Sequence, residues 1–265
     1  MKRGRINFRG QVTIFIIVGV LIVLAAVLAY LFFPQIRPIS VIDSPVGFIE
    51  NCVGEKVNEI VGKIGSQGGS LEPEKSTLYQ NSEVEYLCYT GEYYLNCVVQ
   101  QPMLKQHVES EIEKALIPEV NRCLSDFKET YENKGYSVDI RRTAGDILVE
   151  LAPKNVVVNI RAPITLTKES TTSLEGFNIR IKNEIYDLVL IAMSITNWEA
   201  RYGDSETTTY MTYYPNIKVE KILRSDGTKI YVLSNRDNPE NKFQFASRSV
   251  VLPPGYGGDD ILRRG

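Results

Sequence analysis

The longest hydrophobic run of the chain lies close to its N-terminus. No charged residue occurs between Gly10 and Ile36, and the apolar centre, Val12 to Phe33, is 22 residues long. Because a helix rises about 1.5 Å per residue, this segment would extend about 33 Å, enough to cross the hydrocarbon core of a bilayer. A helix in a soluble core normally keeps a polar stripe, which this run lacks. The pattern predicts a transmembrane helix over residues 12–33.

The charges on either side of this run predict its orientation. The first nine residues carry four cations and no acid, whereas Arg37, Asp43 and Glu50 follow on the other side. Because cations accumulate on the cytoplasmic side of membrane helices, residues 1–11 are predicted to stay in the cytoplasm. The alternative is a cleaved secretory signal ending near Val27–Ala29, and it also places the remaining chain outside the cytoplasmic membrane.

After a proline-bearing connector, residues 34–45, the apolar positions recur first with helical and then with strand periods. The predicted helices are 44–65, 102–131 and 177–195, the last of which would also fit a strand at its start. The predicted strands are a hairpin region over 76–99, an antiparallel meander over 136–168, and segments 210–214, 217–223, 230–233 and 243–252. This order predicts an α+β fold in which about three helices pack on antiparallel sheet.

Residues 46–252 are therefore predicted to form the extracytoplasmic α+β domain. The Thr- and Ser-rich stretch 167–174 indicates an exposed loop, and it is a candidate boundary between two subdomains. Residues 253–265 are rich in Pro and Gly, which favours a disordered tail.

Composition narrows the choice of partners. Four of the 30 Lys and Arg residues precede the hydrophobic run, which leaves 26 against 32 Asp and Glu, a net charge of −6 for the remaining chain. Nucleic acid would favour a basic surface, so it is not the expected partner. Membrane lipid is expected to contact only the N-terminal helix.

The chain has four cysteines, and all of them follow the hydrophobic run. An even number in an oxidising compartment predicts two disulfides, for which three connectivities exist. A loop over 91–94 would set Cys88 opposite Cys97 in a hairpin. Cys52 and Cys123 lie near the apolar stripes of two predicted helices, so their pairing would join those helices. No CxxC motif is present, so a zinc site is not expected.

Four tyrosines around the predicted hairpin, Tyr86, Tyr89, Tyr93 and Tyr94, are candidates for a contact surface, because Tyr is favoured at interfaces. The alternative is that these rings cover one face of the sheet.

No catalytic site is predicted. His107 is the only histidine, and its place early in a helix indicates a solvated side chain. The closely spaced Glu109, Glu111 and Glu113 point in different directions on a helix, so they favour a solvated face over a paired acid site. No nucleophile, phosphate-loop or metal motif occurs, so no cofactor and no metal is expected.

The segment Arg9–Phe15 resembles the leader of archaeal type IV pilins and related surface proteins. That resemblance implies cleavage after Gly10, with Gln11 as the new N-terminus of a hydrophobic assembly helix. Phe15 stands where many such pilins have Glu, and Pro34 and Pro38 interrupt the continuous helix that pilins have after the membrane. The apolar anchor followed by paired cysteines also resembles uncharacterised envelope proteins of small-genome archaea.

The sequence thus predicts a single-pass, membrane-anchored extracytoplasmic protein that acts by binding or assembling with other envelope or surface proteins. A pilin-like filament subunit is the alternative, and an extracytoplasmic enzyme is a third. The partner and the biological process are not predicted.

Overall fold

The structure, a computed structural model, describes residues 17–24, 44–141 and 147–249. Contacts between residues divide the chain into two units, Met1–Ser44 and Pro45–Gly265. In the first unit, residues 17–24 are helical and exposed. Most of the predicted membrane helix, the Gly10–Gln11 junction and the 253–265 tail lie outside the described residues. Among the residues that are described, no helix has both the length and the apolar character needed to span a membrane.

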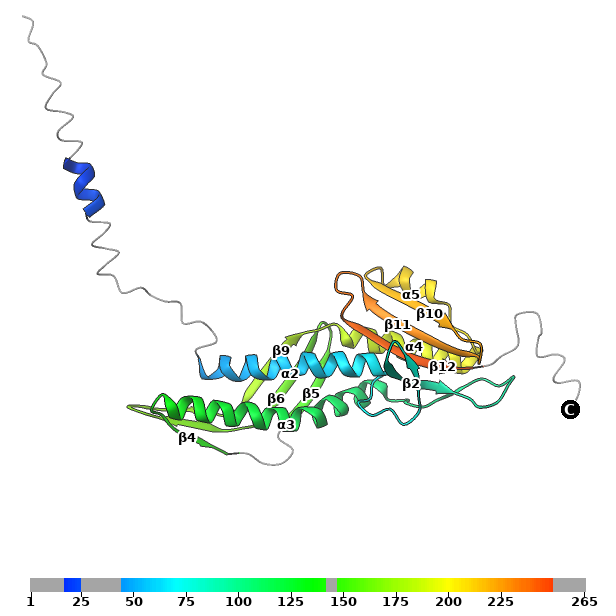
Figure 1. Cartoon of the computed structure of the whole chain (residues 1–265), viewed down its shortest axis with the longest axis horizontal. Coiled ribbons are helices and arrows are strands. Elements are labelled where there is room, and N and C mark those ends of the chain that lie inside the picture. The colour runs from blue at the N-terminus through cyan, green and yellow to red at the C-terminus, as the bar shows by residue number, and fades with distance from the viewer. Residues whose placement is uncertain (1–16, 25–43, 142–146, 250–265) are drawn as a thin grey trace, which may run out of the picture. The chain divides into compact units, whose positions relative to one another are not determined.

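The second unit is α+β, as predicted (Figure 1). Its helices are α2 (Pro45–Gln67), α3 (Leu104–Asn133), α4 (Ile185–Tyr202) and α5 (Thr207–Tyr213). Its first nine strands are β1 (Ser76–Tyr79), β2 (Ser82–Tyr89), β3 (Val98–Val99), β4 (Ser137–Ile140), β5 (Ile147–Ala152), β6 (Asn155–Ile160), β7 (Ile164–Thr167), β8 (Thr171–Leu174) and β9 (Phe177–Lys182). The last three are β10 (Ile217–Leu223), β11 (Thr228–Asn235) and β12 (Lys242–Arg248).

Three sheets are built from these strands. The largest has the order β1-β2-β12-β11-β10, with β3 also paired to β2. All of its pairs are antiparallel except β12 with β2, which run parallel although some 160 residues separate them in sequence. The other two sheets, β4-β7-β8 and β5-β6-β9, are antiparallel and have three strands each.

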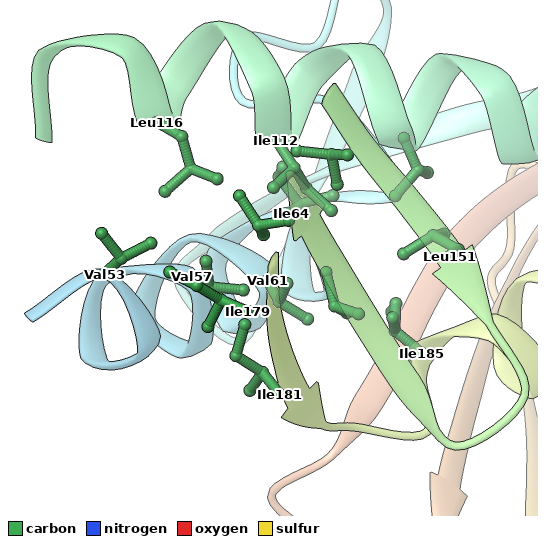
Figure 2. Packing of buried hydrophobic residues seen from close by; sticks show 14 of the residues in the cluster. Val53, Val57, Val61, Ile64, Ile112, Leu116, Leu151, Ile179, Ile181 and Ile185 are labelled. Carbon is green, nitrogen blue, oxygen red and sulfur yellow. The ribbon is translucent and has the colours of Figure 1, made fainter. Parts of the chain in front are cut away.

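The centre of the core lies where α2 and α3 pack on each other and on the β5-β6-β9 sheet (Figure 2). The apolar positions of α2 recur every three or four residues and therefore share one face. That stripe meets the stripe of α3 and the inward side chains of β5 and β9. The buried residues that Figure 2 labels are Val53, Val57, Val61, Ile64, Ile112, Leu116, Leu151, Ile179, Ile181 and Ile185.

Both disulfides pair as the sequence predicts. Cys52 of α2 is bonded to Cys123 of α3, with their Cα atoms 5.9 Å apart, so the bond joins the two long helices. Cys88 is bonded to Cys97 across the loop that follows β2, with a Cα separation of 5.3 Å. The predicted hairpin register is wrong, however. Cys88 faces Val99 of β3 in the sheet, and Cys97 lies just before that strand.

Two predicted elements have the wrong type. Residues 177–182, expected to begin the third helix, form β9, and only Ile185–Tyr202 is helical. The alternating burial of β9 decides this, because Phe177, Ile179 and Ile181 all face inward. Conversely, the predicted strand 210–214 belongs mostly to helix α5.

The predicted meander over 136–168 is also wrong in its connectivity. Strands β5 and β6 form the expected hairpin, but β4 pairs with β7 in a different sheet. The stretch 167–174, predicted to be an exposed loop, completes that second sheet, because β8 pairs with β7 as a short hairpin.

Candidate functional site

A cavity of about 520 Å³ lies between the end of α4 and helix α5. Aromatic rings form much of its wall, and we call it the aromatic groove. It is lined by Ser194, Trp198, Ser205, Glu206, Thr209, Tyr210, Tyr213 and Tyr214. Three of these rings are at least half exposed: Trp198 at 50%, Tyr213 at 76% and Tyr214 at 50%. Large apolar rings that stay exposed around a concavity are a common feature of binding sites.

Local interactions explain why α5 is helical despite its Thr- and Tyr-rich sequence. Glu206 is its N-cap, and its Oε1 atom accepts a hydrogen bond from the backbone N–H of Thr208 at 3.0 Å and another from the Thr208 hydroxyl. Tyr210 is buried, and its hydroxyl lies 3.1 Å from the Ser194 hydroxyl on α4. These contacts hold α5 against α4 and shape the groove between them.

Two polar residues of the groove lining differ in their surroundings. Glu206 is exposed, and its Oε1 accepts both hydrogen bonds of the helix cap. Hydrogen bonds from Thr208 lower the pKa of Glu206, so it is ionised at neutral pH. Ser205 is 1% exposed, and its hydroxyl finds no hydrogen-bond partner in the described part of the chain. Buried hydroxyls are normally satisfied, so this one is unusual.

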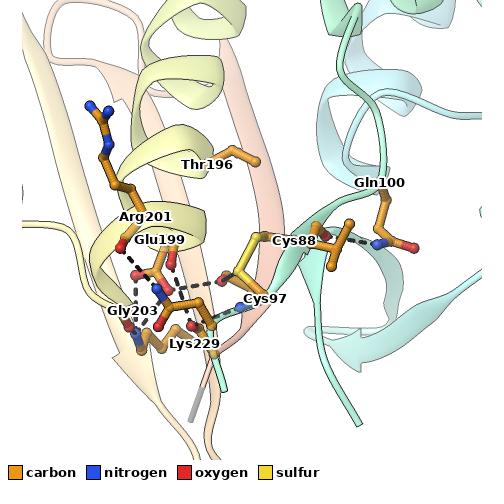
Figure 3. The surroundings of a disulfide bond; sticks show 12 residues. Cys88, Cys97, Gln100, Thr196, Glu199, Arg201, Gly203 and Lys229 are labelled. Atoms are coloured by element: carbon orange, nitrogen blue, oxygen red, sulfur yellow. Dashed lines mark hydrogen bonds and ion pairs between the residues drawn. A yellow bond between two sulfur atoms is a disulfide. The ribbon is translucent and has the colours of Figure 1, made fainter. Parts of the chain in front are cut away.

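A buried ionic network lies next to the groove, at the end of α4 (Figure 3). Glu199 is fully buried, and the Lys229 ammonium lies 2.8 Å from its Oε2 and 3.1 Å from its Oε1. The carboxylate also accepts hydrogen bonds from the Tyr231 hydroxyl and, at 2.9 Å, from the Ser247 hydroxyl. Burial and the neighbouring Glu199 charge raise the pKa of Tyr231 well above its usual range, so it remains a donor.

The same network is connected to the Cys88–Cys97 disulfide. The Cys97 sulfur lies 3.7 Å from the Ser247 hydroxyl, and the Cys97 N–H donates to the Ser249 hydroxyl at 3.1 Å. Asn96 donates to the Arg201 carbonyl at 2.8 Å, so the disulfide loop is bonded directly to α4 (Figure 3). The loop, α4 and the main sheet therefore form one connected support for the groove.

Asp204 extends this network toward the surface. It accepts from Lys221 at 2.9 Å and lies 3.2 Å from Lys229. Burial opposes ionisation of Asp204, but the hydrogen bond from Lys221 and the Lys229 charge outweigh burial and lower its pKa. Asp204 directly precedes Ser205 and Glu206, so these ion pairs fix the backbone that carries both groove residues.

The four tyrosines proposed from sequence as a contact surface are not equivalent. Tyr93 and Tyr94 are exposed on the disulfide loop, with ring centroids 6.5 Å apart. Tyr86 is 7% exposed and its hydroxyl lies 3.0 Å from that of Thr228, so it belongs to a small core. Tyr89 is half-buried beneath the Lys75 ammonium, 3.8 Å from its ring centre. Of the four, only Tyr93 and Tyr94 therefore have exposed rings.

His107 is not the solvated side chain that the sequence predicts. Its Nε2 lies 2.7 Å from the Ser70 hydroxyl, which donates in turn to Glu85 at 2.6 Å. Burial lowers the pKa of His107 and raises that of Glu85. A nucleophilic serine would donate to the histidine, whereas this one donates to a carboxylate and is only 4% exposed. The cluster joins the turn after α2 to β2 and α3.

The acids near His107 have structural partners too. Glu109 accepts from the Leu151 backbone at 2.7 Å, and Glu111 accepts from the Leu71 backbone at 3.2 Å. Across the described residues, no group of three or more His, Cys, Asp or Glu side chains is placed to hold a metal ion. No protein-family model, curated protein or solved structure matches the chain.

The sequence does not predict the aromatic groove, because its residues fall in separate predicted elements. The apolar pattern predicts a helix that ends at residue 195, just before Trp198, and a separate strand over 210–214. One signal was present: Trp198 and Tyr202 are four residues apart, off the apolar stripe of α4, and their rings contact each other with centroids 4.6 Å apart. Two exposed aromatic residues on the solvent side of a helix indicate a contact surface.

Proposed function

We propose that the chain is a single-pass, membrane-anchored extracytoplasmic protein that binds another envelope or surface protein through the aromatic groove. The observation that carries this proposal is the ring of half-exposed side chains, Trp198, Tyr213 and Tyr214, around one concavity. Tyr and Trp supply large contact area with few rotatable bonds, so they are enriched where proteins bind partners.

The groove supports binding better than catalysis. Its lining contains one carboxylate, Glu206, and no His, Lys, Cys or second acid. Hydrolysis of a glycosidic bond requires two facing carboxyl groups, and acyl transfer requires a base beside its nucleophile. Neither arrangement is present among the lining residues.

The location part of the proposal rests on the sequence of the N-terminus and on the disulfides. Residues 12–33 are long and apolar enough to cross a bilayer, and cations precede them. Two disulfides in the second unit suit an oxidising compartment outside the cytoplasm.

Site-specific photo-crosslinking in intact cells tests the binding function. A photoreactive amino acid replaces Tyr213 in the full-length protein, and a matched control replaces Lys128, an exposed residue of α3. We expect a discrete adduct with one protein at position 213 and none at position 128. Absence of an adduct at 213, or the same adducts at both positions, would contradict the proposal.

Protease treatment of intact cells and of lysed cells tests the topology. We expect the second unit to be accessible from outside while residues 1–11 are protected. Intact-mass measurement of the same preparation then defines the N-terminus. A mass that begins at Met1 fits an uncleaved anchor, whereas a mass that begins at Gln11 would replace this proposal with the pilin-like alternative.

A further inference from the structure

A second cavity, of about 410 Å³, lies where three segments of the second unit meet. These segments are helix α2, the junction between β9 and α4, and the turn between β11 and β12. Four asparagines, two lysines and one glutamate supply its polar lining, and we call it the polar cavity. It shares no lining residue with the aromatic groove, so it is a separate site.

Asn183 is the buried polar residue of this lining. It is 6% exposed, and its Oδ1 accepts a hydrogen bond from the Ile185 N–H at 2.9 Å, which fixes the orientation of the amide. Its Nδ2 donates to no described residue, yet it is not fully enclosed by protein, so a group in the cavity can reach it. An amide nitrogen only donates, so the ligand that satisfies it must bring an acceptor.

Two lysines of the lining have no anionic partner. Lys182 ends β9 and Lys242 begins β12, and neither forms an ion pair with a described residue. Glu240 is the only acid of the lining, and the nearby Glu184 accepts a hydrogen bond from Asn235. Two cations against one acid leave the lining with a positive net charge, which favours a ligand that carries a negative charge.

Gly62 keeps the α2 side of the polar cavity open. A glycine inside a helix is destabilising relative to alanine, so its presence needs a reason. Its φ is not in the left-handed region, and a Cβ there would meet nothing within 4 Å. At Gly65, by contrast, a Cβ would collide with the Lys242 carbonyl oxygen. Packing within the protein therefore requires a glycine at 65 but not at 62, where the missing side chain leaves room for a ligand.

The mixture of lining groups indicates a sugar that carries a carboxylate. An inorganic anion would pair with the lysines but fill only part of a cavity of about 410 Å³. Amide side chains both donate and accept, and a carboxylate such as that of Glu240 accepts from hydroxyls although it repels a bare anion. The buried Val61, Ile185 and Leu188 complete the lining with an apolar surface, on which the C–H groups of a sugar ring can pack.

We infer that the polar cavity binds a hexuronic acid, with its carboxylate at the two lysines and its ring and hydroxyl oxygens at Asn183 and the other amides. Charged hydrogen bonds to the lysines supply the strongest contacts, and the amides select a polyhydroxylated ring. Because the aromatic groove takes no part, this site does not depend on the proposed function.

Saturation-transfer difference NMR on full-length protein in detergent measures this binding. The probe is methyl β-D-glucuronide. Methyl β-D-glucopyranoside has the same ring without the charge, and cyclohexanecarboxylate has the charge on a ring without hydroxyls. We expect saturable binding of the glucuronide and at least about 10-fold weaker binding of both comparison compounds, since charged or neutral hydrogen bonds are lost. Free D-glucuronate separates two sources: binding equal to that of the glycoside indicates a glycan residue, whereas binding of the free acid alone indicates a soluble sugar acid.

Variants locate the site. Lys242→Met removes one cation, and Asn183→Asp keeps the oxygen that accepts from Ile185 but replaces the free donor with a charged acceptor. We expect each to weaken binding of the glucuronide by about 10-fold or more. Gly62→Gln fills the opening and should abolish binding while the thermal unfolding midpoint stays equal or rises. Lys63→Met, an exposed position of α2 outside the lining, is the control and should change nothing.

Several results would overturn the inference. Equal binding of the glucopyranoside would show that the charge is not recognised, and equal binding of cyclohexanecarboxylate would show that the hydroxyls are not. No saturable binding of glucuronide or free glucuronate, or unchanged binding in folded Gly62→Gln, would remove the site altogether. The crosslink at Tyr213 tests the aromatic groove independently, so failure here leaves the proposed function standing.

Discussion

The pair formed by Glu199 and Lys229 should be worth more than any ion pair on the surface of the domain. Glu199 is fully buried and the Lys229 side chain is 10% exposed, with 2.8 Å between the charged atoms. At that distance and an effective dielectric constant of about 20, the attraction is about 6 kcal/mol before the cost of removing both groups from water. In Lys229→Met the carboxylate would keep, among the described residues, the hydroxyl donors of Tyr231 and Ser247. We therefore expect Lys229→Met to lower the free energy of unfolding by about 3–5 kcal/mol.

Urea-induced unfolding of the full-length protein in detergent measures this loss, with far-UV circular dichroism as the signal. The double variant Glu199→Gln/Lys229→Met removes both charges and keeps an amide oxygen that can accept from the Tyr231 and Ser247 hydroxyls, and we expect it to be within about 1–2 kcal/mol of the wild type. The control is Lys56→Met, which breaks the 3.0 Å pair with Glu59, a side chain that is 72% exposed. That change should cost less than about 1 kcal/mol.

The reasoning fails if Lys229→Met costs no more than Lys56→Met. It also fails if the double variant is as unstable as Lys229→Met alone, because the penalty would then come from lost packing and not from an unpaired buried charge.

Two further predictions concern the disulfides and pH. The Cys52–Cys123 bond closes a longer stretch of chain than the Cys88–Cys97 bond, with sequence separations of 71 and 9. Replacing the first pair with Ala should therefore lower the free energy of unfolding by about 4 kcal/mol, against about 3 kcal/mol for the second pair. Urea unfolding measures both losses, and the reverse order would contradict the chain-entropy argument. Burial raises the pKa of Glu85 above its ordinary 4.5, so the folded protein holds this proton more tightly than the unfolded chain, and stability should fall as pH rises from 4.5 through the raised value. Glu85→Gln should flatten this part of the profile of unfolding midpoint against pH, and an unchanged slope would exclude Glu85 as its source.

The sequence predicts an element well where the spacing of its apolar residues alone distinguishes a helix from a strand. Helices α2 and α3 follow from stripes repeated over several turns, and β5, β6, β10 and β11 follow from runs of alternating or β-branched residues. The pairing of Cys52 with Cys123 could be derived because each lies near the stripe of one of these helices. Local pattern therefore also predicted which helices pack together.

The predictions are wrong where contacts between distant residues, or single hydrogen bonds, determine the type of element or the surroundings of a side chain. The apolar residues at 177–182 fit both periods, and only pairing with β6 makes them a strand. The Thr- and Tyr-rich segment after Glu206 has high strand propensity, but the Glu206 cap, which accepts from the Thr208 N–H, starts a helix. The sequence predicts a solvated His107 because nothing in it shows that Ser70 lies beside that ring. Helix α5, which the sequence predicts as a strand, forms one wall of the aromatic groove, so the groove is not predicted either.

The parallel pairing of β2 with β12 has a consequence for the order of folding. As the chain is synthesised, β2 emerges long before its partner, and the edge that β12 will cover stays unpaired until nearly the whole described chain has been made. The Cys88–Cys97 bond joins residues only nine positions apart and can form during that interval. It can therefore bring β3 to one edge of β2 while the edge that pairs with β12 is still unpaired. Unpaired strand edges promote aggregation, and we expect a chain truncated before Lys242 to be degraded or insoluble. The main sheet is therefore complete only when β12, the last strand of the described residues, has been synthesised.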